Sequence, residues 1–151
     1  MQESPRTSLL LSGADAGLRD STGVSPIDLA VDHSQDKIVV ALAQKGVDLE
    51  GADEPSLESA VGHNHFSTVR VLLAVGANAN PVSDHVSYTT VLQFAAYTDN
   101  AAAIPVVIEA GANVESADLH DETPLFSAAT HGSCAAMRAI LQLGADIDAK
   151  K

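Results

Sequence analysis

Histidine is the residue type in this chain with the clearest potential for chemistry, because imidazole binds metals and exchanges protons near neutral pH. His63 and His65 stand two residues apart, and His131 precedes Cys134 by three residues. A metal site needs further ligands that converge in space, and a cysteine nucleophile needs a base that a third group orients. The sequence shows neither pattern. We therefore predict no catalytic residue, no metal site and no cofactor, with His65 in a turn and Cys134 as a partly buried thiol.

The elements that must position these side chains recur along the chain. An alanine is followed by a glycine after the same interval four times, in the pairs Ala30 and Gly46, Ala60 and Gly76, Ala95 and Gly111, and Ala128 and Gly144. The segments between one glycine and the next alanine differ in length. Segments of constant length are constrained by packing on both sides, whereas variable ones lie in solvent. The chain is thus predicted to be an array of four similar units, joined by variable loops that we call fingers.

Each constant segment carries apolar residues at the spacing of a helix that buries one face. Examples are the stripes Ile38, Val39, Leu42 and Ala43; Val69, Leu72 and Leu73; Ile104, Val107 and Ile108; and Met137, Ile140 and Leu141. A shorter stripe precedes each of them, so every unit is predicted to be a helix, a tight turn and a second helix. Pro105 lies in one second helix, where it is tolerated only in the first turn. We therefore expect that helix to begin near Ala102 or Ala103.

Start and stop signals support the same two-helix unit. Ser25 and Thr123 each precede a proline, and Thr90 occupies the same position in a third unit. A hydroxyl there caps free backbone N–H groups, and proline suits the first helical position. Gly46, Gly76, Gly111 and Gly144 follow the second stripes, where a helix ends readily with a residue in the left-handed conformation.

These residues resemble the ankyrin repeat, which has a period of about 33 residues and a T-P-L-H-x-A signature. Thr123-Pro124-Leu125 carries the resemblance, together with the corners Gly13-Ala14-Asp15, Gly76-Ala77-Asn78, Gly111-Ala112-Asn113 and Gly144-Ala145-Asp146. The resemblance implies an all-α solenoid of helix-turn-helix units joined by β-hairpin-like fingers. We expect a single domain spanning 1–151, made of a leading half repeat at 1–19 and four full repeats at about 20–52, 53–82, 83–117 and 118–151.

Composition limits the classes of partner. The formal net charge is −12 and the pI is near 4.6, which disfavours nucleic acid and anionic membranes because both bind clustered Lys and Arg. Thirteen of the twenty acids fall in fingers, and five of the eight bases fall on second helices. One cysteine allows no internal disulfide and fits a reducing compartment. We expect a cytoplasmic or nuclear monomer that binds another protein, with a basic surface on that partner.

One column of residues supports two interpretations. His33, His63 and His131 each stand three residues after a repeat alanine, and Thr98 takes that place in the remaining unit. Imidazole suits the negative end of a helix, which is the structural interpretation. The functional alternative is a groove whose binding responds to pH between about 5 and 7.

The resemblance implies a non-catalytic protein-binding module whose partner contacts finger tips and the ends of first helices, along a concave groove. The positions of this chain that match are Ser21, Thr22, Val24, Asp32, His33, Glu54, His63, Val86, Ser87, Thr89, Tyr97, Thr98, Leu119, His120, Glu122, Thr130 and His131. Two alternatives stay open at this point. The chain could be the targeting segment of a larger enzyme, such as a kinase or ubiquitin ligase, or it could be a structural spacer.

Overall fold

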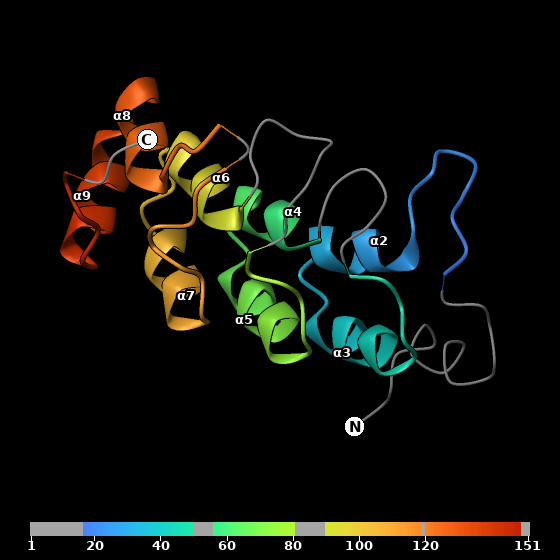
Figure 1. The fold of residues 1–151 in the computed structure, drawn as a ribbon. Coiled ribbons are helices and arrows are strands. Elements are labelled where there is room, and N and C mark those ends of the chain that lie inside the picture. The colour runs from blue at the N-terminus through green and yellow to red at the C-terminus, as the bar shows by residue number, and fades with distance from the viewer. Residues whose placement is uncertain (1–16, 50–55, 81–89, 119, 149–151) are drawn as a thin grey trace.

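The computed structural model describes residues 17–49, 56–80, 90–118 and 120–148, and every regular element within them is a helix. The helices form two layers (Figure 1). The first helices of the units form the upper row of the figure, which we call the inner layer, and the second helices form the lower row, the outer layer. The inner helices are α2 (Pro26–Asp32), α4 (Ser56–Gly62), α6 (Val91–Tyr97) and α8 (Pro124–His131). The outer helices are α3 (Asp36–Gln44), α5 (Phe66–Ala74), α7 (Ala103–Glu109) and α9 (Cys134–Gln142). The predicted all-α array of four helix pairs is confirmed.

The inner helices begin at the predicted caps. The side chains of Ser25, Thr90 and Thr123 accept hydrogen bonds from the backbone N–H three residues on. Ser25 and Asp28 cap each other reciprocally, since Asp28 also accepts from the backbone N–H of Ser25 at 2.8 Å. These contacts satisfy donors that every helix start leaves without a partner.

The ends of the outer helices also match the sequence signals. Gly76 and Gly111 have φ values of 104° and 102°, a left-handed conformation in which a Cβ would be strained. α7 begins at Ala103, so Pro105 lies in its first turn and displaces no internal hydrogen bond. The prediction of a late start for that helix is confirmed.

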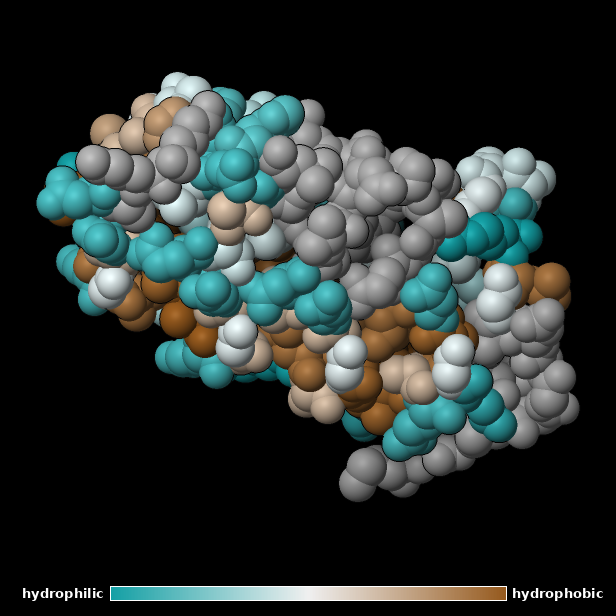
Figure 2. All heavy atoms as spheres, in the orientation of Figure 1, coloured by the Kyte–Doolittle hydropathy of each residue, from teal (hydrophilic) through white to brown (hydrophobic). Residues whose placement is uncertain are grey.

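The core is a continuous seam between neighbouring helix pairs. Each inner helix packs on the next inner helix, and each outer helix on the next outer one. Leu42, Leu72, Ile104 and Ile140 are fully buried in this seam. Leu73 belongs to the same predicted stripe but is only partly buried, because it lies one residue past the buried face of α5. In Figure 2, apolar side chains form a band along the stack, with polar side chains above it.

Side chains in the turns between helices join each unit to the preceding one. His65 Nδ1 donates to the backbone oxygen of Val31 at 3.0 Å, and Asn100 Nδ2 donates to that of Val61 at 2.9 Å. At the last boundary, Asp99 Oδ1 accepts from the backbone N–H of Ala136 at 2.8 Å. The structural role predicted for His65 is therefore confirmed, and these bonds fix the register of the stack.

Candidate binding surface

Asp20 organises the finger that precedes α2. Its carboxylate accepts hydrogen bonds from the Thr22 hydroxyl at 2.6 Å, from the Thr22 backbone N–H at 2.8 Å and from the Val24 backbone N–H at 3.1 Å. These bonds, led by that of the Thr22 hydroxyl, hold the pKa of the Asp20 carboxyl below its ordinary value. The chain then turns at Gly23, whose φ is 86°. Ser21 and Thr22 are thus presented at an exposed tip, with Val24 partly buried beneath them.

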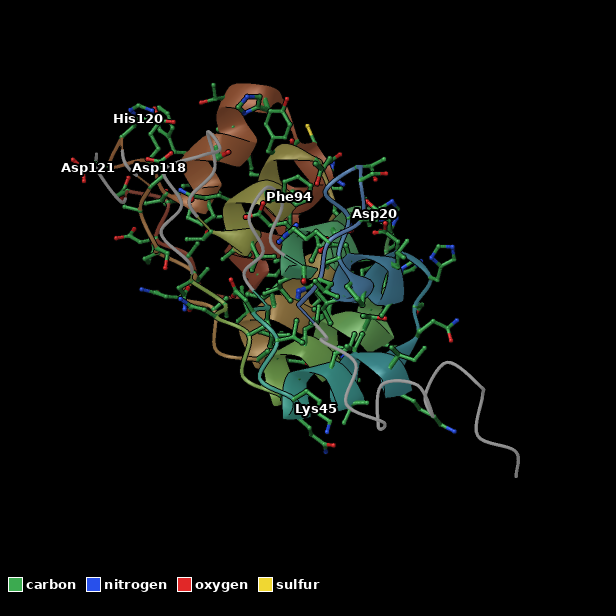
Figure 3. All side chains as sticks on the ribbon, turned by 90° about the vertical axis from the view of Figure 1, so that its right-hand side faces the viewer. Asp20, Lys45, Phe94, Asp118, His120 and Asp121 are labelled. Atoms are coloured by element: carbon green, nitrogen blue, oxygen red, sulfur yellow. The ribbon has the colours of Figure 1, made fainter. Side chains whose placement is uncertain are left out.

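Asp118 does the same for the finger before α8. Its Oδ1 accepts from the backbone N–H groups of His120 at 2.7 Å and Glu122 at 2.9 Å, and Asp121 takes a φ of 60°. Figure 3 shows Asp118, His120 and Asp121 together at this tip, far from Lys45 at the end of α3. The Glu122 backbone oxygen accepts from the buried amide of Gln93 on α6 at 2.6 Å. The two described finger tips therefore share one geometry, and α6 holds the second in place.

The exposed C-terminal ends of α2, α4, α6 and α8 form the second part of the surface, which we call the inner-helix ends. Nδ1 of His33, His63 and His131 lies 2.9, 3.0 and 2.9 Å from the backbone oxygen four residues earlier. Thr98 follows the same rule, because its hydroxyl donates to the backbone oxygen of Phe94 at 2.9 Å. The column seen in the sequence is therefore a set of helix caps, as the structural interpretation predicted. All four side chains are also exposed.

Neighbouring inner-helix ends contact one another. Asp32 Oδ1 accepts from the Ser59 hydroxyl at 2.9 Å and lies 3.8 Å from His63 Nδ1. The ring of Tyr97 meets that of His131 edge-on, with ring centroids 4.5 Å apart. Thr130 completes the last unit, where its hydroxyl donates to the Phe126 backbone oxygen at 3.0 Å. The predicted residues of the inner-helix ends thus contact one another in two pairs of units, with Asp32 beside α4 and Tyr97 beside α8.

This arrangement does not assemble a nucleophile. Ser59, His63 and Asp32 share a neighbourhood, but the serine proton is donated to the carboxylate, and His63 Nδ1 donates to a backbone oxygen. A serine nucleophile would need its proton directed at the imidazole. Within the described ranges no group of three or more His, Cys, Asp or Glu side chains could hold a metal ion.

The prediction for Cys134 was wrong. We expected a partly buried thiol, but the side chain is exposed at the first residue of α9. Ser133, one residue earlier, takes the buried position of this turn and donates to the Tyr97 backbone oxygen at 3.3 Å. His131 contacts Tyr97 and its own helix end.

Some predicted contact residues cannot be placed, and two exposed residues were missed. Glu54, Val86, Ser87, Thr89 and Leu119 lie outside the described residues. Leu29 on α2 and Phe126 on α8 are exposed to 51% and 42% although they are apolar. The helical spacing of apolar residues identified core positions only, because it detects residues on the buried face of a helix. An apolar residue off that stripe was the signal that could have identified them. Within the described residues, no helix has the length and apolar character needed to cross a bilayer.

Comparison with known proteins agrees with this geometry. A family model described as "Ankyrin repeats (3 copies)" matches residues 57–151. The p105 subunit of nuclear factor NF-kappa-B from Gallus gallus is 30% identical in a 148-residue alignment that covers 91% of this chain and 15% of that protein. The ankyrin repeat domain of Bcl-3, described as a unique member of the IkappaB protein family, has a solved structure that superposes with a TM-score of 0.84. The two are 25% identical over 95% of this chain and 66% of that one. The chain belongs to the ankyrin repeat family, whose domains are typically non-catalytic protein-binding modules.

Proposed function

We propose that this chain is a non-catalytic module that binds another protein across its finger tips and inner-helix ends. One observation carries the proposal: at the same position of all four inner helices, side chains are exposed and held in fixed orientations by their own backbone. Fixed, exposed side chains lose little conformational freedom on binding, which favours affinity. The similarity to Bcl-3 and p105 supports a protein as the class of partner.

The residues of the proposed contact are those that the ankyrin resemblance implied. On the finger tips these are Ser21, Thr22, Val24, Glu54, Val86, Ser87, Thr89, Leu119, His120 and Glu122. On the inner-helix ends they are Asp32, His33, His63, Tyr97, Thr98, Thr130 and His131. Tyr97 is the proposed anchor, because it is 39% exposed on α6 and aromatic residues dominate binding hot spots.

The proposed partner has a basic surface. The net charge of −12 and the carboxylates of the described finger tips would draw such a surface toward this side of the molecule. Lys37 and Arg70 lie on the outer helices, whereas Arg19 lies in the finger before α2, where it pairs with Asp28 at 3.7 Å. We propose that the chain acts as a monomer in the cytoplasm or nucleus, with no role in binding nucleic acid or membranes.

The test is to capture partners from a lysate of the source cells and then to measure binding kinetics with variants. We expect Tyr97→Ala to weaken binding by more than about 1 kcal/mol. Asp32→Asn combined with Glu122→Gln should mainly slow association, because both changes remove charge at nearly constant shape. Lys37→Ala on α3 is the matched control and should change little. The proposal fails if Lys37→Ala weakens binding more than Tyr97→Ala does.

A further inference from the structure

The hydrogen bonds of the three capping histidines fix which ring nitrogen carries the proton. A backbone oxygen can only accept, so Nδ1 of His33, His63 and His131 must be the donor in each contact. A neutral imidazole has one N–H, so Nε2 must carry a lone pair. Nε2 of each ring is therefore a hydrogen-bond acceptor, on a side chain that is exposed.

Two threonines of the same face follow this rule. Thr98 and Thr130 donate their hydroxyl protons to the backbone oxygens of Phe94 and Phe126, which leaves lone pairs on their oxygens that can accept a hydrogen bond. The three histidines and these two threonines thus have their donors occupied by their own backbone and keep acceptor atoms on exposed side chains. Asp32 adds a carboxylate between the first two units, at 42% side-chain exposure. We call these residues the acceptor column: Asp32, His33, His63, Thr98, Thr130 and His131.

We propose that the acceptor column binds a segment of a partner protein that carries arginine side chains, and that this binding is stronger while its histidines are neutral. This inference rests on the proposed function and specifies the chemistry of its partner. A guanidinium has five N–H donors and no acceptor, so it complements the acceptor atoms of these six side chains. The negative ends of four helices and a net charge of −12 favour the same cation.

Protonation reverses the chemistry of this surface without breaking the helix caps. An imidazolium keeps Nδ1–H, so each bond to the backbone oxygen remains, while Nε2 changes from acceptor to donor and the ring gains a positive charge. His63 then lies 3.8 Å from Asp32 and neutralises that carboxylate, with the ring of His65 stacked at 5.7 Å. The His131 ring makes a T-shaped contact with the ring of Tyr97. The His33 ring contacts the backbone of its own helix through Nδ1. Arginine binding should therefore weaken when acidification protonates these rings.

The first measurement is the tautomer of each histidine. Long-range proton-nitrogen correlation spectra of the uniformly nitrogen-15-labelled chain at about pH 8 distinguish a protonated Nδ1 from a protonated Nε2. We expect His33, His63 and His131 to show a protonated Nδ1. A protonated Nε2 on these rings would mean that the column offers donors, and the inference would be wrong.

The second measurement is binding of a labelled peptide in which arginine alternates with serine. Near physiological salt, distant charges are screened and close contacts dominate. Between about pH 7.5 and pH 5.5 we expect affinity to fall about tenfold, the size produced by one or two new like charges a few ångströms from the guanidinium groups. The NMR chemical-shift changes that the peptide causes should include the three histidine rings. Chemical-shift changes confined to the carboxylate residues of the finger tips, or an affinity that does not depend on pH, would overturn the inference.

The chain supplies its own control in Thr98, which caps α6 with a hydroxyl that does not titrate. The triple variant His33→Thr, His63→Thr and His131→Thr should keep its helices, and whatever affinity it has for the peptide should not change between about pH 7.5 and pH 5.5, because a hydroxyl does not titrate in that range. A variant that keeps the wild-type pH dependence would contradict us. If the variant does not fold, the tautomers and the wild-type titration still decide. The proposed function is tested separately by the captured partner, so a failed peptide titration leaves it standing.

Discussion

His65 donates a hydrogen bond from Nδ1 to the backbone oxygen of Val31, 3.0 Å away in the preceding helix pair. Asn100 makes the equivalent bond to Val61 one unit later, at 2.9 Å. Asn100 Nδ2 also donates to Asn64 Oδ1 at 2.9 Å. Two residue types thus perform one task, which is to supply a side-chain donor to the oxygen that ends a buried inner helix. Stability of a repeat stack depends on such nearest-neighbour contacts.

We predict that Asn100→Ala lowers the free energy of unfolding by about 1 to 3 kcal/mol, because it leaves a largely buried backbone oxygen without this donor. The measurement is urea denaturation followed by circular dichroism. The exposed finger residue His120 is the control, and His120→Ala should cost less than about 0.5 kcal/mol. Equal losses for the two variants would mean that the bond does not contribute to the stack.

A pair of adjacent leucines tests the position of the seam. Leu72 is fully buried, whereas Leu73 is partly buried. Leu72→Ala should cost about 2 to 5 kcal/mol because it leaves a cavity between helix pairs, and Leu73→Ala should cost clearly less. Denaturant titration of both variants checks this order. A larger loss at Leu73 would contradict the described register of α5.

Substitution of alanine for each of two glycines should change the stability of the chain in opposite directions. Gly76 has a φ of 104°, so Gly76→Ala should destabilise the chain by about 1 kcal/mol through backbone strain. Gly62 lies in α4, and a Cβ there would meet Phe94 at an ordinary distance of 3.6 Å. Gly62→Ala should therefore stabilise the chain by up to about 1 kcal/mol. Thermal unfolding of both variants, compared with wild type, measures the two signs.

The Asp20 carboxyl should titrate below its ordinary pKa, because the Thr22 hydroxyl and two backbone N–H groups favour its charged form. Since the folded pKa is the lower one, its stabilising contribution is present above the unfolded pKa. That contribution is lost as the pH falls through the folded pKa. Carbon-detected NMR titration measures the folded value, and Thr22→Val should raise it by removing the leading cause. An unchanged pKa in that variant would assign the shift to the backbone N–H groups alone.

Much of the helical framework could be predicted from the sequence because its signals are local. Thr123 caps α8, Gly111 follows α7 and Pro105 lies in a first turn as expected, since each depends on the backbone conformation of a few neighbouring residues. The exposure of Cys134 and the partial burial of Leu73 depend on how whole helix pairs rotate against each other. Spacing along one helix does not contain that information.

The candidate site also has features that the sequence predicted and features that it did not. The positions of His33, His63 and His131 at helix ends follow from counting residues from the repeat alanines. The bond that orients each ring is also local, but its consequence for Nε2 depends on knowing the acceptor, which only coordinates provide. The contact of Asp32 with Ser59 and His63 joins two neighbouring units, and the sequence did not predict it.

If a protein partner docks on the finger tips and inner-helix ends, hydrogen exchange measured with and without the captured partner should locate it there. Binding should slow backbone exchange at residues 20–24 and 118–122 and at the C-terminal ends of α2, α4, α6 and α8. Exchange in α3, α5, α7 and α9 should change much less. Protection concentrated on those outer helices, with the fingers and inner-helix ends unchanged, would mean that the partner binds the opposite side of the stack.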